Sequence, residues 1–220
     1  MGLRMRAIVL ALTATLTAEC SRTPVEEFPT APLATATGAV TSAAWSASSA
    51  APRAADAPAA GRCIRPTPDA PPARVAPGPA PGCPRDPEGP QKVPVVGVGF
   101  PDATAGSVAV DAELVSTEHD TTRGLMYRTS MPEERGMLFD LRSREDHQFW
   151  MHNTCIPLDL FYIDRDGLLV GIVESAPTLD DMPRGVGCPS VYVLETNAGW
   201  ARRHGVKAGQ HVNLPREVLR

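Results

Sequence analysis

The segment FWMHNTCIPLD, residues 149–159, places polar side chains directly beside large apolar ones. A core strand would stay apolar throughout, and an exposed loop would not use Trp150. Asn153 donates and accepts hydrogen bonds at once, and Asp159 follows Pro157, after which a turn is expected. This combination predicts the wall of a pocket or a buried hydrogen-bond network.

Three charged residues elsewhere are candidates for the same site. Arg123 and Arg128 flank the sequence GLMY, and Glu195 interrupts an apolar run, where it must face outward or be paired. Polar groups inside apolar strands cost free energy unless they are hydrogen-bonded, so we expect Asn153 and Asp159 to lie near one of the arginines. The predicted ligand-binding residues are Arg123, Arg128, Trp150, Asn153, Thr154, Asp159 and Glu195.

A purely structural role would also explain these residues. Asn153, Thr154 and Asp159 would then satisfy backbone groups where a strand meets a turn. Arg128 would form an ion pair with Asp159 or Glu195. These two explanations differ in whether the side chains converge on a common pocket.

Two chemical alternatives remain open. In a hydrolase-type enzyme, Asp159 and Glu195 would act as a carboxylate pair, roughly 5 to 9.5 Å apart, with His152 as a base. In a copper-binding protein, thioether and imidazole groups would bind Cu(I). The candidate copper ligands are Met126, Met137, Met151 and His152. Since the sequence has no serine elbow motif and a strand would point Met151 and His152 to opposite faces, we favour a non-catalytic binding module without cofactor or metal.

Strands and two short helices are predicted to position these residues. Alternation of apolar and polar residues, β-rich composition and an Asp-Gly turn indicate the strands. The predicted strands are 107–115, 136–141, 147–154, the two arms of a hairpin within 158–175, 190–196 and a last one within 207–214. Helices are expected at 118–127, capped by Ser116 or Thr117, and at 197–205, capped by Asn197 and ended by Gly205. The predicted class is α+β but mostly β, with a compact, largely antiparallel, curled or barrel-like sheet that lacks parallel crossovers.

Four of the five cysteines are predicted to form disulfides, and four cysteines allow three pairings. Cys155 and Cys188 belong to the folded region, and Cys188 lies in a Pro/Gly-rich loop that needs an anchor. We predict a bridge between these two, which would stabilise the domain by about 3 to 4 kcal/mol. Cys63 and Cys83 lie in the Pro-rich region before it, and their pairing stays open.

The N-terminal region is typical of an exported protein. In MGLRMRAIVLALTATLTAEC, Arg4 and Arg6 precede an apolar run that is too short to span a bilayer, so residues 1–20 are predicted to be a signal peptide. Cys20 follows this run, which leaves two alternatives: lipidation of Cys20, or ordinary cleavage near Ala18. Both place the protein outside the cytoplasm, in the periplasm, anchored to the envelope or secreted.

The region after the signal is predicted to be a tether. Of the 23 prolines, 16 lie between Pro24 and Pro94, in a stretch that almost lacks aromatic residues. Such a stretch cannot bury enough apolar surface to offset its conformational entropy. We therefore predict a disordered tether over residues 21–93 and a globular domain over residues 94–220.

The charge distribution excludes one class of partner. Residues 95–220 carry 12 basic and 18 acidic side chains, without clusters of lysine or arginine. An acidic domain of this kind is a poor nucleic-acid binder. The expected partner is a small molecule or an envelope protein, and contact with a membrane is expected only through a lipid at Cys20.

Three blocks of the sequence resemble a known family. RGLMYRTSMPEERGMLFDL, FWMHNTCIPLDLFYIDRDGLLVGIVE and YVLETNAGWARRHGVKAGQHV are similar to the family DUF192, also called UPF0127, over roughly residues 106–214. The family usually has Lys at the position of His152 and an apolar residue at that of Cys155. The resemblance implies a compact, β-rich, often exported domain, and it implies no reaction. Function must therefore be argued from the site.

Overall fold

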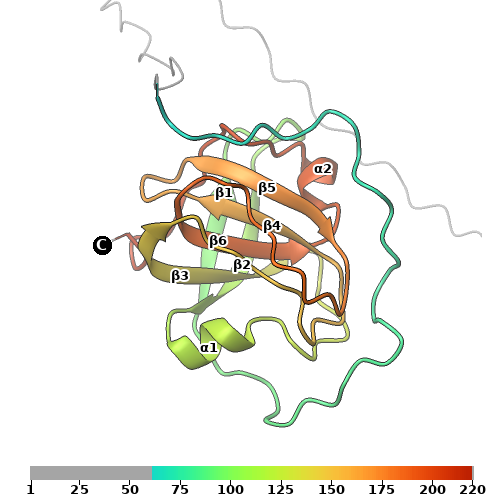
Figure 1. Ribbon diagram of the computed structural model, residues 1–220. Coiled ribbons are helices and arrows are strands. Elements are labelled where there is room, and N and C mark those ends of the chain that lie inside the picture. Colours follow the sequence, from blue (N-terminus) through green and yellow to red (C-terminus); the bar gives the residue numbers. More distant parts are fainter. Residues whose placement is uncertain (1–60, 220) are drawn as a thin grey trace, which may run out of the picture. The chain divides into compact units, whose positions relative to one another are not determined.

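A single mixed sheet organises residues 61–219, which are the residues described by the computed structural model (Figure 1). Its spatial order is β1-β2-β3-β6-β4-β5. The strands are β1 (Val95–Phe100), β2 (Val108–Val115), β3 (Arg135–Glu145), β4 (Leu158–Ile163), β5 (Leu169–Ala176) and β6 (Ser190–Asn197). The helices are α1 (Glu118–Arg123) and α2 (Trp200–His204). The predicted α+β, mostly β class is confirmed.

One pair of neighbouring strands departs from the antiparallel pattern. β2 and β3 run parallel, with residues 111–115 aligned against 135–139, whereas the other four neighbouring pairs are antiparallel. Parallel neighbours require a crossover connection, which residues 116–134 provide through α1. The prediction of a sheet without parallel crossovers is therefore wrong for this pair.

The segment predicted as a last strand, 207–214, instead spans the two edges of the sheet. It forms only isolated bridges, from His211 to Leu168 and from Asn213 to Gly99. Gly99 lies in β1 and Leu168 directly precedes β5, so the segment contacts both edge strands. The sheet curls without closing, and this segment covers edge groups that would otherwise be exposed.

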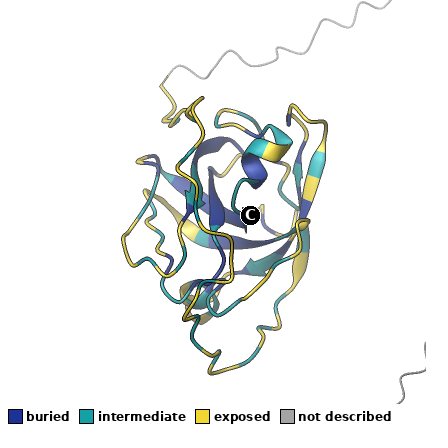
Figure 2. Ribbon diagram, turned by 90° about the vertical axis from the view of Figure 1, so that its right-hand side faces the viewer, coloured by how far each residue is buried: buried dark blue, intermediate teal, exposed yellow. Residues whose placement is uncertain are grey.

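Most residues of the central strands are buried (dark blue in Figure 2). Their apolar side chains belong to two clusters, one on each face of the sheet. All six residues of β4 are buried, which explains the nearly continuous apolar run LDLFYI. On one face Phe100, Phe161 and Trp200 pack with ring centroids 5.1 to 5.8 Å apart. On the other face Met137 and Tyr162 belong to a second apolar cluster. A polar group on either face of these strands is therefore shielded from water.

Helix α1 begins as predicted and ends earlier. The hydroxyl group of Thr117 accepts a hydrogen bond from the backbone N–H of Asp120, so Thr117 is the N-cap. The helix ends at Arg123 because Gly124 adopts a φ of 49°, outside the helical range. A side chain at residue 124 would also contact the ring of Phe139 at 3.2 Å. This close approach seats the end of α1 directly over β3.

Helix α2 ends at Gly205 as predicted, with a φ of 67°, but it begins differently. Its N-cap is Gly199 in the left-handed conformation, without a side-chain cap of its own. The Asn197 side chain, predicted to be the cap, instead donates to the backbone carbonyl of Met131 at 2.9 Å. The N–H groups at the start of α2 are satisfied from another strand, as described below.

The segment 147–154, predicted as a strand, is a loop. Phe149 forms an isolated bridge with Arg184, in which each backbone N–H donates to the other carbonyl at 2.8 Å. Asn153 then adopts a φ of 51°, which ends any extended run. The partner of this segment is therefore another loop and not a strand of the sheet. We call residues 147–154 the Trp150 loop.

Residues 61–93 contain no helix or strand, yet they pack along the sheet as an extended arm, drawn in teal to green in Figure 1. The N–H of Arg65 donates to the carbonyl of Val170 at 2.7 Å. The Arg202 guanidinium donates to three consecutive carbonyl groups of this arm. Within the described residues, the arm is therefore packed against the domain, because distant parts of the chain anchor a segment that has no core of its own.

Two disulfides attach the arm, and they correct the predicted pairing. Cys63 pairs with Cys188 and Cys83 pairs with Cys155, with Cα atoms 5.4 and 5.5 Å apart. The predicted bridge between Cys155 and Cys188 is wrong because each of these cysteines faces the arm. Since the arm was expected to be disordered, its cysteines could not be recognised as partners for the domain.

Several predictions concern residues outside the described range. The signal peptide at 1–20, the lipidation of Cys20 and the tether from 21 to 60 all lie there. Within residues 61–219, neither helix is long and apolar enough to cross a membrane.

Candidate functional site

A pocket with a cavity volume of about 270 Å³ lies between α1, β3, β6 and the Trp150 loop. Each of the three sequence blocks that resemble the family contributes side chains to it. Arg123 comes from the first block, Trp150 and Thr154 come from the second, and Glu195 comes from the third. The predicted convergence is therefore real for these four residues.

Glu195 is the most unusual member of this pocket. In the sheet it lies opposite Met137 on β3 and Leu160 on β4, so its side chain points to their buried face. The residue is only 4% exposed. Within residues 61–219, no hydrogen bond or salt bridge joins its carboxyl group to another residue. The sequence predicted a paired or outward-facing glutamate, and the structure instead places it facing the pocket.

Burial governs the protonation of this carboxyl group. Desolvation raises the pKa of Glu195 to about 8, while the charge of the Arg128 guanidinium lowers it by a smaller amount. At neutral pH the group is therefore mostly a neutral acid that can donate a hydrogen bond. A buried carboxyl group with a displaced pKa in a pocket is a recognised mark of a functional site.

Aromatic side chains form the walls around Glu195. Phe139 of β3 and Phe149 of the Trp150 loop meet edge to face, with ring centroids 5.0 Å apart. Trp150 is 49% exposed and its ring lies 5.2 Å from that of His152. An exposed tryptophan at the edge of a pocket is available to a ligand, since its contacts within the chain leave half of it open.

Polar groups complete the lining. The Thr154 hydroxyl group donates to the carbonyl of His152 at 3.2 Å, which leaves its oxygen free to accept. Gln148 supplies an amide group, and a ring nitrogen of His147 lies 3.1 Å from the carbonyl oxygen of Ser143. His147 and Gln148 were not among the predicted site residues. Their position directly before the aromatic pair was the only sequence signal that could have suggested them.

The charge of Arg123 is neutralised by the arm. Its guanidinium contacts Asp86 at 2.6 Å and Glu88 at 2.8 Å, and it also donates to the carbonyl of Gly89. The Arg123 side chain is only 9% exposed. The arm therefore supplies the acidic partners of an arginine that the sequence suggested would bind a ligand.

Arg128 lies outside this pocket and is also paired. It forms two hydrogen bonds with the carboxylate of Glu113, at 2.7 and 2.6 Å. The pairing with Arg128 is the largest cause of a lowered pKa at Glu113. The expectation that Arg128 would pair with Asp159 or Glu195 is therefore wrong, because β2 offers a nearer carboxylate in a bidentate geometry.

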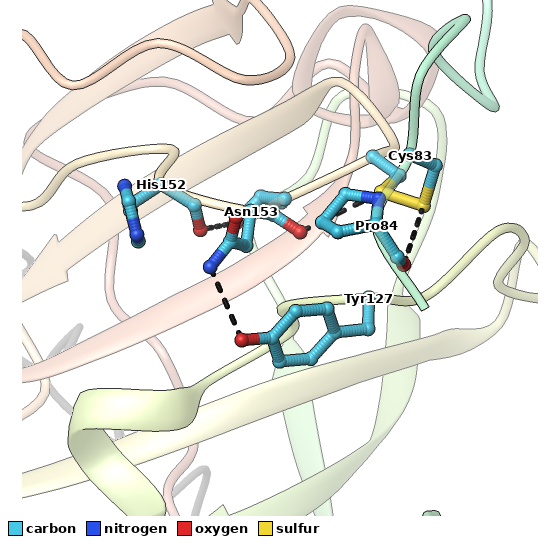
Figure 3. Close-up of a disulfide and its surroundings, with 7 residues drawn as sticks. Cys83, Pro84, Tyr127, His152 and Asn153 are labelled. Atoms are coloured by element: carbon cyan, nitrogen blue, oxygen red, sulfur yellow. Dashed lines mark hydrogen bonds between the residues drawn. A yellow bond between two sulfur atoms is a disulfide. The ribbon is translucent and has the colours of Figure 1, made fainter. Parts of the chain in front are cut away.

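Asn153 acts on the shape of the Trp150 loop and does not line the pocket. Its side-chain amide donates to the hydroxyl group of Tyr127 at 3.1 Å (Figure 3). Its backbone carbonyl accepts from the Tyr127 N–H at 2.8 Å. The Cys83–Cys155 disulfide follows two residues later in the same region (Figure 3). Together these contacts hold the loop that carries Trp150 against α1 and the arm.

Asp159 lies on the opposite face of the sheet from Glu195. In β4 it alternates with Leu160, whose side chain shares the face of Glu195. The Asp159 carboxylate accepts hydrogen bonds from the backbone N–H groups of Ser175, Gly199 and Ala201, at 2.8 to 3.0 Å. The carboxylate pair required by the hydrolase alternative is therefore not formed, and Asp159 instead organises the start of α2.

We expect the substitution Asp159→Ala to lower the free energy of unfolding by about 3 kcal/mol, because it leaves three buried N–H groups without an acceptor. Asp159→Asn should cost less, since its remaining oxygen can still accept two of the three hydrogen bonds. Urea unfolding of both variants with the disulfides intact measures this difference. The exposed Asp111→Asn is the matched control, and equal stability of Asp159→Ala and the wild-type protein would contradict the assignment.

The proposed copper ligands do not form a cluster. Met137 and Met151 are fully buried in the second apolar cluster, where methionine is a packing residue. His152 lies outside it, with a ring nitrogen 2.7 Å from a carboxylate oxygen of Asp181. Met126 lines the pocket, whereas His152, the histidine among the proposed copper ligands, does not.

Comparisons with known proteins identify relatives but no activity. The profile of the family DUF192, described as an uncharacterised ACR, matches residues 101–214. A crystal structure of a protein of unknown function from Novosphingobium aromaticivorans is 32% identical, with a TM-score of 0.54, and the match covers 61% of this chain and 94% of that one. A candidate transcription regulator from Sinorhizobium meliloti is also 32% identical with a TM-score of 0.54, over 57% of this chain and 98% of that one. No curated protein sequence matches.

Proposed function

Because the chain belongs to the DUF192 family, whose description assigns no reaction, we propose a function from the pocket itself: a non-catalytic module that binds a small organic ligand at Glu195. The observation that carries this proposal is the buried Glu195 carboxyl group, which has no hydrogen-bond partner within residues 61–219 and faces a pocket built from three separate parts of the chain. A polar group buried without a partner is costly. A bound ligand would supply that partner.

The proposal favours binding over catalysis because the two groups that the sequence suggested for a reaction, Asp159 and Cys155, are not available to the pocket. Asp159 is on the other face of the sheet and is occupied by backbone N–H groups. Cys155 is in a disulfide, so its thiol is not a nucleophile. Glu195 by itself can donate or accept a proton. Neither Asp159 nor the Cys155 thiol stands beside it to carry out a covalent step.

We further propose that the protein works outside the cytoplasm, where its two disulfides persist. The signal-like residues 1–20 support export, and Cys20 offers a lipid anchor in one of the two alternatives. The Pro-rich region before residue 61 would then act as a spacer between the envelope and the binding module.

An envelope protein is the second candidate partner, and one observation favours it. Trp150, Leu179 and Met182 are exposed apolar side chains on two loops that are joined by the bridge between Phe149 and Arg184. Neighbouring exposed apolar residues mark interaction sites. A protein bound here would cover Trp150 and would therefore compete with the small ligand.

We expect ligand-observed NMR with the full, oxidised chain to detect binders in a library of small polar metabolites, with binding weakened at least tenfold by Trp150→Ala or Glu195→Gln. Both side chains border the pocket, so a pocket ligand must respond to both changes. The exposed Glu134→Gln is the matched control for Glu195→Gln and should leave binding unchanged. A library without any binder that responds to the two pocket variants would reject the proposed function.

A further inference from the structure

We infer that the ligand of this pocket carries an organic ammonium group, which sits against Glu195 between the aromatic walls. The inference rests on the proposed function, because it names the chemical class of the ligand for the same pocket. It is carried by the charge balance around the pocket, by the aromatic lining and by the burial of the carboxyl group.

The charges nearest the pocket leave a single acid unpaired. Arg123 is neutralised by Asp86 and Glu88 of the arm, and Arg128 is engaged by Glu113 in a bidentate pair. Neither arginine forms a salt bridge with Glu195, although Arg128 contributes a favourable charge from a distance. A ligand with a positive charge would pair with the ionised form of Glu195, whereas an anionic ligand would be repelled by that form.

The aromatic lining suits the same ligand class. Phe139, Phe149 and Trp150 border the space in front of Glu195, and Trp150 is half exposed. Cations are attracted to aromatic faces, most strongly to tryptophan, and ammonium groups are the ligands for which such lining is commonly used. The apolar part of an alkylammonium ion would also remain in contact with these rings.

Burial makes the expected binding dependent on pH in a defined direction. A cation binds the ionised form of Glu195. Because the pKa is about 8, the neutral acid predominates at pH 7 and must lose its proton when the cation binds. An alkylamine stays protonated below about pH 9, as lysine does. Binding should therefore release close to one proton at pH 7 and should strengthen about tenfold for each pH unit up to about pH 8.

Other polar groups in or near the pocket require controls. Arg123 at the end of α1 and His147 in the Trp150 loop line it. Arg128 and Tyr162 lie outside it but interact electrostatically with Glu195. Burial raises the pKa of Tyr162, so this phenol stays neutral in the range tested. His147→Gln separates the contribution of this imidazole, which lines the pocket, from that of Glu195.

The test uses three probes of one shape with the full, oxidised chain: n-butylammonium, its neutral counterpart n-butanol and its anionic counterpart butyrate. At pH 8 the ammonium ion should bind at least tenfold more tightly than either of the others. Calorimetry in two buffers of different ionisation enthalpy should show the proton release at pH 7. Tetramethylammonium keeps the positive charge but cannot donate a hydrogen bond, so its weaker binding would show that the N–H groups of n-butylammonium bond to Glu195.

Matched variants connect the result to Glu195. Glu195→Gln should lower n-butylammonium affinity at least tenfold at pH 8 and abolish its pH dependence. Glu134→Gln and His147→Gln should preserve the steep rise up to about pH 8. Circular dichroism and urea unfolding of each variant verify that a loss of binding is not a loss of folding.

Two results would overturn the inference. Equal affinity for n-butanol and n-butylammonium is one, and ammonium binding that survives Glu195→Gln is the other. If the three probes fail while the metabolite library yields a neutral or anionic pocket ligand, the inference falls and the proposed function stands. If neither the probes nor the library bind at the pocket, both fall.

Discussion

Between pH 5 and pH 9, the free energy of unfolding of the wild-type protein should fall by about 4 kcal/mol relative to that of the Glu195→Gln variant. The cause is the raised pKa of the buried Glu195 carboxyl group, about 8 in the folded protein against 4.5 for an ordinary glutamate. Between these two values the folded protein keeps a proton that the unfolded chain releases. Rising pH therefore favours unfolding, and the stabilisation present below pH 4.5 is lost as the pH passes 8.

The difference between the two proteins isolates this group from the others that titrate. Burial also raises the pKa of Asp159, which acts in the same direction, whereas pairing with arginines lowers the pKa of Glu113, Asp164 and Asp166. These groups are common to the wild-type protein and to Glu195→Gln, so their contributions cancel. Glutamine imitates the neutral acid and cannot ionise.

Urea unfolding at each pH unit from 5 to 9 measures the effect, with Glu134→Gln as the control that keeps the wild-type pH dependence. Parallel stability curves for the wild-type protein and Glu195→Gln would show that Glu195 titrates normally. In that case the carboxyl group is hydrated, and burial does not govern its protonation.

Removing the Cys83–Cys155 disulfide with the double substitution Cys83→Ser and Cys155→Ser should lower the free energy of unfolding by about 4 kcal/mol. The bridge closes a loop with a sequence separation of 72 residues. Its loss restores conformational freedom to the unfolded chain, and it also frees one end of the Trp150 loop. Ligand binding should therefore weaken together with stability.

Urea unfolding and limited proteolysis test this prediction. In the oxidised wild-type protein, a piece of the arm that contains Cys83 should stay attached after cuts on both sides of Cys83, until the disulfide is reduced. In the double variant, the same two cuts should release that piece without reduction. Cys20→Ser leaves both disulfides intact and is the control. A double variant that unfolds with the wild-type midpoint would mean that the arm contributes nothing to the fold.

Local features of the sequence predicted the parts of the fold that local interactions decide. The hairpin of β4 and β5 follows from two apolar runs around the Asp-Gly turn at residues 164–167. The start of α1 at Thr117 and the end of α2 at Gly205 follow from capping chemistry that acts within four residues. Strand β1 was not predicted, because its glycines and the preceding Pro94 hide the pattern of an edge strand.

The candidate site was predicted only in part, for a related reason. Glu195 and Trp150 were recognised because a charge in an apolar run and a tryptophan in a polar segment are costly in isolation. Their partners were not recognised. Asp86 and Glu88 lie in an arm whose composition predicts an unstructured segment, and Glu113 lies on β2, next to the edge strand β1. Asp159 was assigned to the pocket, although alternation along β4 places it on the other face.

The sequence by itself therefore determined the family, the mostly β class and the fact that polar groups of three blocks meet. Composition, periodicity and turn chemistry contain that information because they act over a few residues. Only the tertiary structure decided the parallel pairing of β2 with β3, the two disulfide pairings and which carboxyl group faces the pocket. Each of these depends on contacts between residues far apart in the chain, and such contacts leave no periodic pattern in the sequence. The arm is the clearest case, since its order comes from the domain it touches.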